Sequence, residues 1–378
     1  MKNNKKIMLV AGEASGDLHG GNLAREILAA RPDLQLMGMG GSMMRGAGVD
    51  TVIDNSELAV VGIYEVLSHI GVIKRAFDTL KGIIQNSPPS LIVLIDYPDF
   101  NLRLAKVAKA AGVPVLYYIS PQIWAWRRGR VKTIAGLVRK MLVVFPFEEQ
   151  FYKDAGVECR FVGHPLLDAM KEMPGRDELA SRFGLDPDRP IFGILPGSRR
   201  KELSFHLPVM LESYNLLKEK IPGLQGVIPV ASSLSERDFA PYMEGFEEVR
   251  LVSGDTDGVM ALMDAAAVAS GTATLQTALY GKPMVIIYRL SPITYFLGRM
   301  LIKVKHIGAV NLVADEEVVP ELIQDDATPE NISSLIFKMF CDKAYYAEVV
   351  EKLGRVREKL GGPGASARAA EEVVRLID

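Results

Sequence analysis

Two carboxylates in one short segment are the residues best suited to acid–base chemistry. Residues 96–101 read Asp-Tyr-Pro-Asp-Phe-Asn and follow an aliphatic run at 91–95 that is typical of a buried β-strand. A carboxylate at the carboxyl end of such a strand has little water around it, which favours a role as general base. The alternative is that Asp99 caps the following helix and Asp96 completes a turn. Asp96 and Asn101 add further polar groups at the same strand end.

Three turns rich in small residues could bind an anionic or polyhydroxyl ligand. Residues 12–17 (Gly-Glu-Ala-Ser-Gly-Asp), 195–199 (Leu-Pro-Gly-Ser-Arg) and 270–274 (Ser-Gly-Thr-Ala-Thr) each follow a strand-like run and open a helix. Small residues at such a turn let backbone N–H groups approach a ligand. For each turn the alternative is an ordinary capped helix start.

The two later turns together predict a clamp for a nucleotide diphosphate, to which Arg199 adds a guanidinium. The first turn lacks the Lys-Ser/Thr of a Walker loop. Its candidate ligand-binding residues are Ser15, Gly16 and Asp17. Those of the diphosphate clamp are Gly197, Ser198, Arg199, Ser270, Gly271, Thr272 and Ala273.

Both tryptophans of the chain lie beside a cluster of cations. Residues 120–128 read Ser-Pro-Gln-Ile-Trp-Ala-Trp-Arg-Arg, so that Trp124 and Trp126 stand next to Arg127. Aromatic rings next to arginine suit a sugar face and a phosphate, or a lipid headgroup layer. A solvated basic turn over ordinary core tryptophans is the alternative.

Metal and nicotinamide chemistry have little support in the sequence. The five histidines are scattered and only two cysteines occur, so no zinc-like spacing is present. Residues 255–257, Asp-Thr-Asp, resemble the Asp-x-Asp of metal-dependent transferases, but we expect Asp255 to cap a helix. Residues 38–42, Gly-Met-Gly-Gly-Ser, lack the third glycine of a dinucleotide fingerprint. We therefore expect no metal and no other cofactor.

Repeated strand and helix patterns predict the elements that position these residues. Aliphatic runs end in Gly, Asp, Pro or Ser and precede helical patterns, which is typical of parallel βα units. A polar stretch at 168–189 interrupts this rhythm, and a second series starts at 191–195. We expect α/β architecture with two doubly wound Rossmann-like domains, residues 1–168 and 169–349, facing a central cleft. The helices of about 350–378 could pack back on the first domain.

Composition and charge narrow the classes of function. Hydrophobic residues make up 48% and charged residues 24%, which fits a globular protein. Lys and Arg total 44 against 46 Asp and Glu, so the net charge of -2 gives no pull toward nucleic acid. Two cysteines fit a reducing cytoplasmic setting. The amino-terminal apolar run is too short for a signal peptide, and we expect no membrane span.

Two segments combine large apolar residues with cations and predict docking on a membrane surface. They are residues 60–77 and 286–306. Helices of this kind lie in the interface with the apolar face down and cations near anionic headgroups. The alternative is that both are ordinary core helices.

Seven motifs occur in the order found in the lipid-A-disaccharide synthase family, which the chain resembles from residue 12 to about 321. They are the segments at 12–17, 96–101, 120–127, 195–199 and 270–275, together with Phe-Pro-Phe-Glu at 145–148 and Val-Gly-His-Pro at 162–165. The resemblance implies an inverting, metal-independent glycosyltransferase of the two-domain GT-B fold. It also implies a peripheral protein on the inner face of the cytoplasmic membrane, and it is compatible with a homodimer.

The implied substrates are UDP-2,3-diacylglucosamine and 2,3-diacylglucosamine 1-phosphate, joined through the 6-hydroxyl into a β-1,6 disaccharide. By this likeness Asp99 is the candidate base and Glu13 lies near the reacting sugars. The side of the acceptor sugar would comprise Ser15, Gly16, Asp17, Asp96, Asn101, Trp124, Trp126 and Arg127. Arg199 would meet the diphosphate, and the turn at 270–274 would meet UDP. Asn311 belongs to the same implied UDP side, although Ala-Val-Asn replaces the usual Leu-Pro-Asn there.

Gln276 stands where related transferases often carry the glutamate that binds the ribose diol, and Ser42 replaces a usual proline. Two other functions share the expected architecture: a UDP-N-acetylglucosamine 2-epimerase and a non-enzymatic nucleotide-sugar binding module. An epimerase needs no lipid-facing surface, and a binding module would not need Asp99. The motifs therefore favour the transferase.

Overall fold

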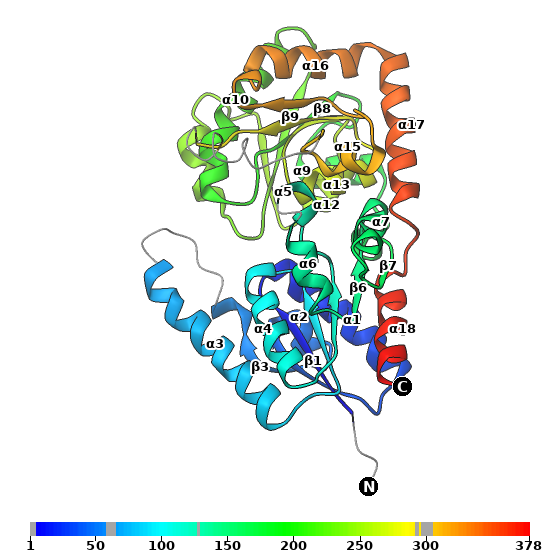
Figure 1. The fold of residues 1–378 in the computed structure, drawn as a ribbon. Helices are drawn as coiled ribbons and strands as arrows, with labels where there is room; N and C mark the ends of the chain where they lie inside the picture. Colours follow the sequence, from blue (N-terminus) through cyan, green and yellow to red (C-terminus); the bar gives the residue numbers. More distant parts are fainter. Residues whose placement is uncertain (1–4, 58–65, 127–128, 292–294, 296–304) are drawn as a thin grey trace. The chain divides into compact units, whose positions relative to one another are not determined.

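Two compact units make up the chain. The computed structural model describes residues 5–57, 66–126, 129–291, 295 and 305–378 (Figure 1). One unit comprises Met1–Ala169 and Leu360–Asp378, and the other comprises Met170–Lys359. The sequence predicted a boundary after residue 168 and a return of the chain at about residue 350. In the structure the chain leaves unit 1 after Ala169 and returns at Leu360.

A parallel sheet forms the centre of unit 1, with the strand order β3-β2-β1-β4-β5-β6-β7 among the described residues. Its strands are β1 (Lys6–Ala11), β2 (Gln35–Gly40), β3 (Asp50–Asp54), β4 (Leu91–Ile95), β5 (Val115–Tyr118), β6 (Lys140–Val143) and β7 (Cys159–Phe161). The strand order reverses between β1 and β4. Doubly wound sheets bind ligands beyond the carboxyl ends of the strands at such a reversal.

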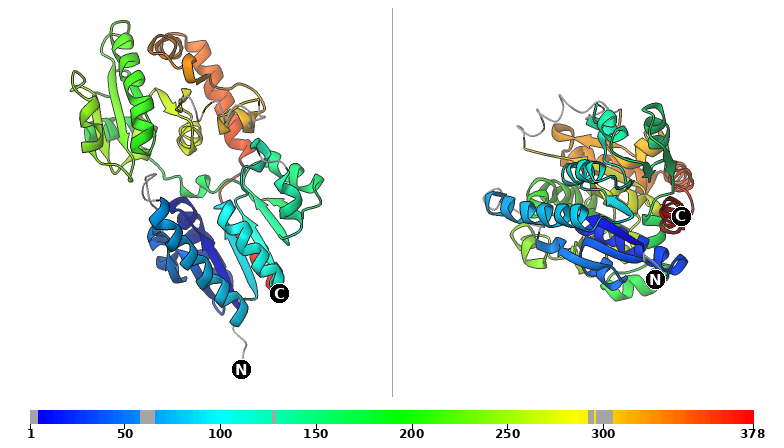
Figure 2. Two further views of the ribbon diagram at one scale, coloured as in Figure 1. Left: turned by 60° about the vertical axis from the view of Figure 1, so that its left-hand side comes forward. Right: turned by 60° about the horizontal axis from the view of Figure 1, so that its bottom comes forward.

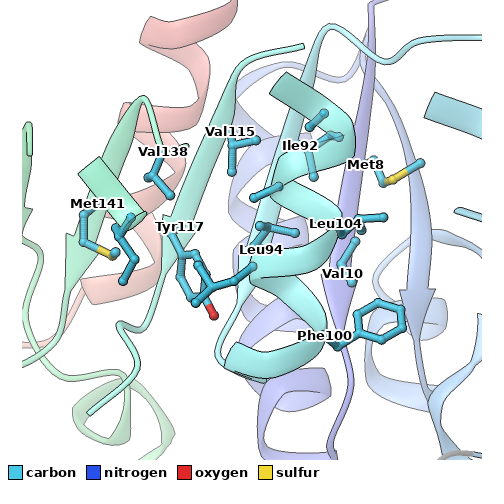
Figure 3. Packing of buried hydrophobic residues seen from close by; sticks show 14 of the residues in the cluster. Met8, Val10, Ile92, Leu94, Phe100, Leu104, Val115, Tyr117, Val138 and Met141 are labelled. Carbon is cyan, nitrogen blue, oxygen red and sulfur yellow. The ribbon is translucent and has the colours of Figure 1, made fainter. Parts of the chain in front are cut away.

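Aliphatic side chains build the core that supports this edge of the sheet. Every residue of β4 is completely buried, as expected of a parallel strand covered on both faces. Complete burial of one such side chain stabilises the fold by about 1.5–3 kcal/mol. In Figure 3, Phe100 and Leu104 of helix α4 (Pro98–Ala110) lie over Val10 and Leu94 of the sheet. The side chains of α4 that pack on β1 and β4 therefore fix the positions of these two strands.

The helices of unit 1 begin at the turns that the sequence indicated. Helix α1 (Ala14–Ala30) starts directly after Glu13, and α4 starts at Pro98, whose fixed φ suits the first helical position. The other helices before unit 2 are α2 (Ser42–Gly46), α3 (Val66–Asn86), α5 (Ile123–Trp126), α6 (Arg130–Ala135), α7 (Pro146–Asp154) and α8 (Leu166–Ala169).

The C-terminal helix α18 (Ala365–Ile377) completes unit 1, where it packs against α1 (Figures 1 and 2). Asp168 accepts hydrogen bonds from the backbone N–H groups of Gly364 and Ser366 at 2.6 and 2.9 Å, which caps the helix. Glu372, almost completely buried on α18, forms ion pairs with Lys140 at 2.6 Å and with Arg160. The end of the chain is thus tied to strands β6 and β7.

Unit 2 is built around a second parallel sheet, with the order β10-β9-β8-β11-β12-β13 among the described residues. Its strands are β8 (Ile191–Leu195), β9 (Gln225–Val230), β10 (Arg250–Ser253), β11 (Ala265–Ala269), β12 (Met284–Tyr288) and β13 (Glu321–Ile323). Its helices are α9 (Arg176–Phe183), α10 (Arg200–Lys218), α11 (Glu236–Phe239), α12 (Thr256–Leu262), α13 (Thr272–Leu279), α15 (Ala309–Ala314), α16 (Pro329–Cys341) and α17 (Lys343–Lys359). Two parallel α/β sheets confirm the predicted fold class.

Candidate active site

The carboxyl ends of β1 and β4 bring two predicted site residues together. The strands pair in register, with Ala11 opposite Ile95, so Glu13 and Asp96 emerge side by side at the same edge. Glu13 is exposed in front of α1, whereas Asp96 is partly buried in the turn before α4. The sequence predicted Glu13 near the reacting sugars and Asp96 on the acceptor side, and the pairing of β1 with β4 makes them neighbours.

The turn that carries Asp96 has a strained backbone. Asp96 and Tyr97 have φ angles of 45° and 47°, in the left-handed region that side chains disfavour. Such residues cost about 1–3 kcal/mol each and persist where the surroundings fix them. The amide of Asn101 donates to the carbonyl of Ile95 at 3.2 Å and to that of Asp96 at 2.7 Å. The hydroxyl of Tyr117 donates to the same Asp96 carbonyl at 2.5 Å.

Gly12 provides the space that this turn needs. A Cβ atom at Gly12 would lie 2.2 Å from Cδ1 of Tyr97, so no larger residue fits while the ring keeps its place. The Tyr97 ring also packs on Phe100, with the ring centroids 5.6 Å apart. The first glycine of the Gly-Glu-Ala-Ser-Gly-Asp motif therefore accommodates the Asp-Tyr-Pro-Asp-Phe-Asn motif.

The environment of Asp96 changes its acidity. Burial, reinforced by the negative charge of Glu13, raises the pKa of the Asp96 carboxyl from its ordinary value of 3.8 to about 6. A carboxylate that titrates near neutral pH can both accept and release a proton under physiological conditions. Perturbed carboxylates of this kind are concentrated at active sites.

Asp99, the predicted base, lies in a different environment. It occupies the first turn of α4, where its side chain is 71% exposed and forms an ion pair with Arg130 at 2.8 Å. Arg130 begins α6 and follows the Trp-Arg segment that the sequence assigned to the acceptor. The structure therefore places Asp99 beside a cation rather than in the buried turn.

Three predicted acceptor residues lie in α1, and they differ in what they contact. Ser15 is exposed, and Gly16 is buried against Ala11. Asp17 is buried and accepts hydrogen bonds from the backbone N–H groups of Gly41 at 2.7 Å and Met43 at 3.0 Å. Asp17 thus caps the start of α2 from within the protein, and Ser15 keeps its hydroxyl at the surface.

A buried glutamate holds the predicted tryptophan segment. Glu148, from the Phe-Pro-Phe-Glu motif, accepts hydrogen bonds from Nε1 of Trp124 at 3.0 Å and from the Ser120 hydroxyl. Its second oxygen accepts from the backbone N–H of Phe145, the N-cap residue of α7, at 3.1 Å. Burial raises the pKa of Glu148 to about 7. The side chain of Trp126 and residue Arg127 lie outside the described part.

The turn after β8 is closed by a carboxylate. Both Ser198 and Arg199 donate their backbone N–H groups to Oε2 of Glu202, at 2.8 and 3.2 Å, and the Arg199 guanidinium lies 3.0 Å from Oε1. Gly197 has a φ of 116°, and a Cβ there would meet Glu202 at 2.3 Å. The backbone N–H groups of Ser198 and Arg199, which the sequence assigned to a phosphate, therefore bind Glu202 in this structure. The Arg199 side chain is 70% exposed.

His206 connects this turn to the end of β12, a role that the scattered histidines of the sequence did not reveal. Its Nδ1 lies 3.0 Å from the carbonyl oxygen of Pro196, and its Nε2 accepts from the backbone N–H of Arg289 at 3.2 Å. Burial lowers the pKa of His206, which favours the neutral ring that both contacts require. The imidazole thus fixes two loops at one edge of the sheet.

The turn after β11 leaves the start of α13 accessible. Gly271 and Thr272 are exposed, whereas Ser270 and Ala273 are half-buried. Helix α13 carries Gln276, also half-buried, one turn further on. The first N–H groups of a helix lack partners within the helix and attract anions. Residues 270–273 and Gln276 therefore lie together at the same end of α13.

Asn311, predicted on the UDP side, is bonded entirely within unit 2. Its Oδ1 accepts from the backbone N–H groups of Val318 and Val319 at 2.8 and 3.1 Å. Its Nδ2 donates to the Val319 carbonyl at 2.8 Å and to Glu321 at 2.7 Å. These four bonds use the hydrogen-bonding capacity of the amide, so Asn311 shapes the loop that follows α15.

Asp255 caps α12 as predicted, because it accepts from the backbone N–H of Gly258 at 2.9 Å. Within the described ranges, no group of three or more His, Cys, Asp or Glu residues could hold a metal ion. Among the same residues, no helix is both long and apolar enough to cross a membrane. Much of the two predicted docking segments, residues 60–65, 292–294 and 296–304, lies outside the described part.

Comparison with known proteins agrees with this architecture. The family model described as lipid-A-disaccharide synthetase matches residues 7–370. The lipid-A-disaccharide synthase of Geobacter metallireducens is 54% identical over 375 residues, which cover 99% of this chain and 98% of that protein. That of Geobacter sulfurreducens is 54% identical over 373 residues, covering 98% and 97%.

Solved structures share the fold at low sequence identity. A putative UDP-N-acetylglucosamine 2-epimerase from Listeria monocytogenes has a TM-score of 0.65 at 12% identity, with 98% of this chain and 95% of that chain covered. The glycotransferase of kitacinnamycin has a TM-score of 0.64 at 16% identity, with both chains fully covered.

Fold and relatives together define a UDP-sugar glycosyltransferase of the GT-B type. The order of the motifs, the match of the family model and the 54% identity to curated relatives all agree on the particular family. The chain belongs to the lipid-A-disaccharide synthase family.

Proposed function

We propose that the protein transfers 2,3-diacylglucosamine from UDP-2,3-diacylglucosamine to the 6-hydroxyl of 2,3-diacylglucosamine 1-phosphate (lipid X). The products are the β-1,6-linked disaccharide 1-phosphate and UDP. The observation that carries this proposal is the carboxylate pair Glu13 and Asp96 at the edge of the unit 1 sheet. A hydroxyl nucleophile needs such a base, whereas a binding module does not. The sequence predicts Asp99 as that base.

Unit 2 binds the UDP moiety in this proposal. The start of α13 and the exposed guanidinium of Arg199 supply positive potential for the leaving diphosphate. Gln276 meets the ribose. These groups take the place of a metal ion, so EDTA should leave the rate unchanged. A rate that falls with EDTA and returns with magnesium would contradict this part of the proposal.

The protein works at the inner face of the cytoplasmic membrane in this proposal. Each methylene drawn out of a bilayer costs about 0.8 kcal/mol, so the enzyme must approach the lipid. Ile73 of α3, within the predicted docking segment 60–77, is 36% exposed and supports a lipid-facing surface at this helix. Co-sedimentation with anionic vesicles, weakened by salt, is the expected result. Equal binding to anionic and zwitterionic vesicles at all salt concentrations would contradict an electrostatic contribution.

The reaction can be tested directly with purified protein and the two proposed substrates. We expect a disaccharide 1-phosphate and UDP in equal amounts. UDP-N-acetylglucosamine alone serves as the control, since a 2-epimerase would convert it to its C2 epimer. Epimer formation without disaccharide would overturn the proposal.

A further inference from the structure

We propose that His206 and Gln324 are positioning residues, which fix Arg289 so that its guanidinium binds the diphosphate of the UDP-sugar. This inference rests on the proposed function, because it requires that unit 2 binds UDP. It adds a second cation to a site whose positive potential otherwise comes from Arg199 and the start of α13. The three residues belong to different elements, and the structure brings them together at one edge of the unit 2 sheet.

The segment that follows β12 lies beside the turn that precedes α13. Ala269 of β11 pairs with Ile287 of β12, and the backbone N–H of Ser270 donates to the Ile287 carbonyl at 2.8 Å. The chain therefore leaves β12 next to the predicted diphosphate clamp. Because parallel strands end at the same edge of a sheet, Arg289 lies at the edge where ligands of doubly wound sheets bind.

Side chains hold the backbone of this segment in place. Nε2 of His206 accepts from the backbone N–H of Arg289 at 3.2 Å. The amide of Gln324 binds the next residue twice, since its Oε1 accepts from the N–H of Leu290 at 2.6 Å and its Nε2 donates to the Leu290 carbonyl at 3.1 Å. Three hydrogen bonds, from α10 and from the turn after β13, thus fix two successive residues.

Gln324 makes these contacts from an unfavourable backbone conformation. Its φ angle is 51°, in the left-handed region that side chains disfavour. Tyr288 of β12 is opposite Ile323 of β13, so Gln324 directly follows the last paired residue. Strain of this kind persists where the surroundings fix it, and it is concentrated at functional sites. The strained residue is the one whose amide holds Leu290.

The two contacts of His206 determine which ring nitrogen carries the proton. Nε2 accepts a hydrogen bond, so the proton is on Nδ1, which donates to the Pro196 carbonyl at 3.0 Å. Burial, together with the charge of Arg289, lowers the pKa of His206, which keeps the ring neutral at neutral pH. His206 thereby joins the segment at Arg289 to the turn that carries Arg199.

The guanidinium of Arg289 is available for a ligand. The side chain is half-buried, and within the described ranges its guanidinium forms no ion pair and no hydrogen bond. Arg199, in contrast, is paired with Glu202 at 3.0 Å and is 70% exposed. Partial burial reduces the screening of a charge by solvent and salt. The planar donors of an arginine match the oxygens of a phosphate, so Arg289 is suited to the dianionic diphosphate.

The first test measures the dissociation constant for UDP by calorimetry at pH 8. Arg289→Gln should weaken UDP binding about tenfold, because a charge-assisted hydrogen bond to the diphosphate is lost. In the disaccharide assay the same variant should raise the KM for the UDP-sugar and leave the KM for the acceptor unchanged. Arg250→Gln is the matched control, since it removes an exposed arginine at the amino end of β10, and its UDP binding should equal that of the wild type.

A second set of variants separates positioning from support of the fold. His206→Leu removes both hydrogen bonds of the ring and should weaken UDP binding about tenfold, whereas His206→Gln can donate and accept through its amide and should restore most of the affinity. Gln324→Asn tolerates the left-handed backbone but is too short to hold Leu290. It should weaken UDP binding in the wild type and have little effect in Arg289→Gln, because it acts through that guanidinium.

Unchanged UDP binding in Arg289→Gln would overturn the inference and leave the proposed function intact. Equal losses in His206→Gln and His206→Leu, or a Gln324→Asn effect of the same size with and without Arg289, would refute the positioning roles. A wild type that neither binds UDP nor forms disaccharide would overturn the proposed function, and this inference with it.

Discussion

Replacing Asp96 by asparagine should stabilise the folded protein while it removes activity. Burial and the charge of Glu13 make the ionised carboxylate unfavourable in the fold, as its raised pKa records. Asn cannot ionise, can accept the hydrogen bond that the backbone N–H of Tyr97 offers to this side chain, and adopts left-handed backbone readily. The substitution therefore removes the unfavourable burial of a negative charge and keeps the hydrogen bond from the Tyr97 backbone.

The size and the pH dependence of this gain follow from the pKa of Asp96. A rise from 3.8 to about 6 corresponds to at most about 3 kcal/mol at 1.36 kcal/mol per pKa unit. Between these two values the native state binds more protons than the unfolded chain, so wild-type stability falls as pH rises. The advantage of the variant should be about 3 kcal/mol above pH 7 and about half of that at pH 5.

Denaturant titration followed by tryptophan fluorescence measures this quantity. Both tryptophans, Trp124 and Trp126, belong to unit 1, so the signal reports on the unit that contains Asp96. The free energy of unfolding would be compared at pH 5 and pH 8 for wild type, Asp96→Asn and the exposed-site control Asp50→Asn. A gain of equal size at both pH values, or a loss at both, would show that the environment of Asp96 does not disfavour its charge.

Three further substitutions test other contacts. Gly12→Ala places a Cβ 2.2 Å from the Tyr97 ring, which would displace the turn that carries Asp96. Turnover should fall at least about tenfold while the affinity for UDP stays unchanged. Unchanged turnover would show that the turn accommodates the methyl group. Asn311→Ala removes four internal hydrogen bonds and should destabilise unit 2 by roughly 2–4 kcal/mol, measurable by hydrogen exchange at 318–321. Gln276→Glu should tighten UDP binding about tenfold in calorimetry, because a carboxylate accepts hydrogen bonds from the ribose hydroxyls more strongly than an amide does. Weaker binding would show that the ribose does not contact residue 276.

The sequence was sufficient to predict the strands that carry the site. The runs 91–95 and 191–195 coincide with β4 and β8, because fully buried parallel strands leave an uninterrupted aliphatic pattern. The turns after these strands were also predicted, because glycine and proline favour turns through their own backbone preferences, independently of distant residues. Helix α4 begins at Pro98, within the motif that the sequence singled out.

The direction and partners of polar side chains could not be predicted in the same way. Asp17 was assigned to the acceptor side, yet its partners are backbone groups more than twenty residues away. Glu148 was noticed only as part of a motif, and His206 was not assigned any role. These contacts depend on distant segments meeting in the fold, which no local pattern of residue types records. The left-handed backbone at Asp96 and Tyr97 could not be predicted either, because these residue types do not by themselves indicate a positive φ.

The return of α18 to unit 1 has a consequence for the order of events during synthesis. Unit 1 is complete only when residues 360–378 have been made, and the whole of unit 2 is translated first. At about 5–20 residues per second, Lys140 and Arg160 wait on the order of ten to forty seconds for Glu372. Unit 2 can begin to fold on the ribosome during this interval, although its last residue, Lys359, is made only shortly before Glu372. The contacts that tie α18 to β6 and β7 are therefore among the last to form in the nascent chain.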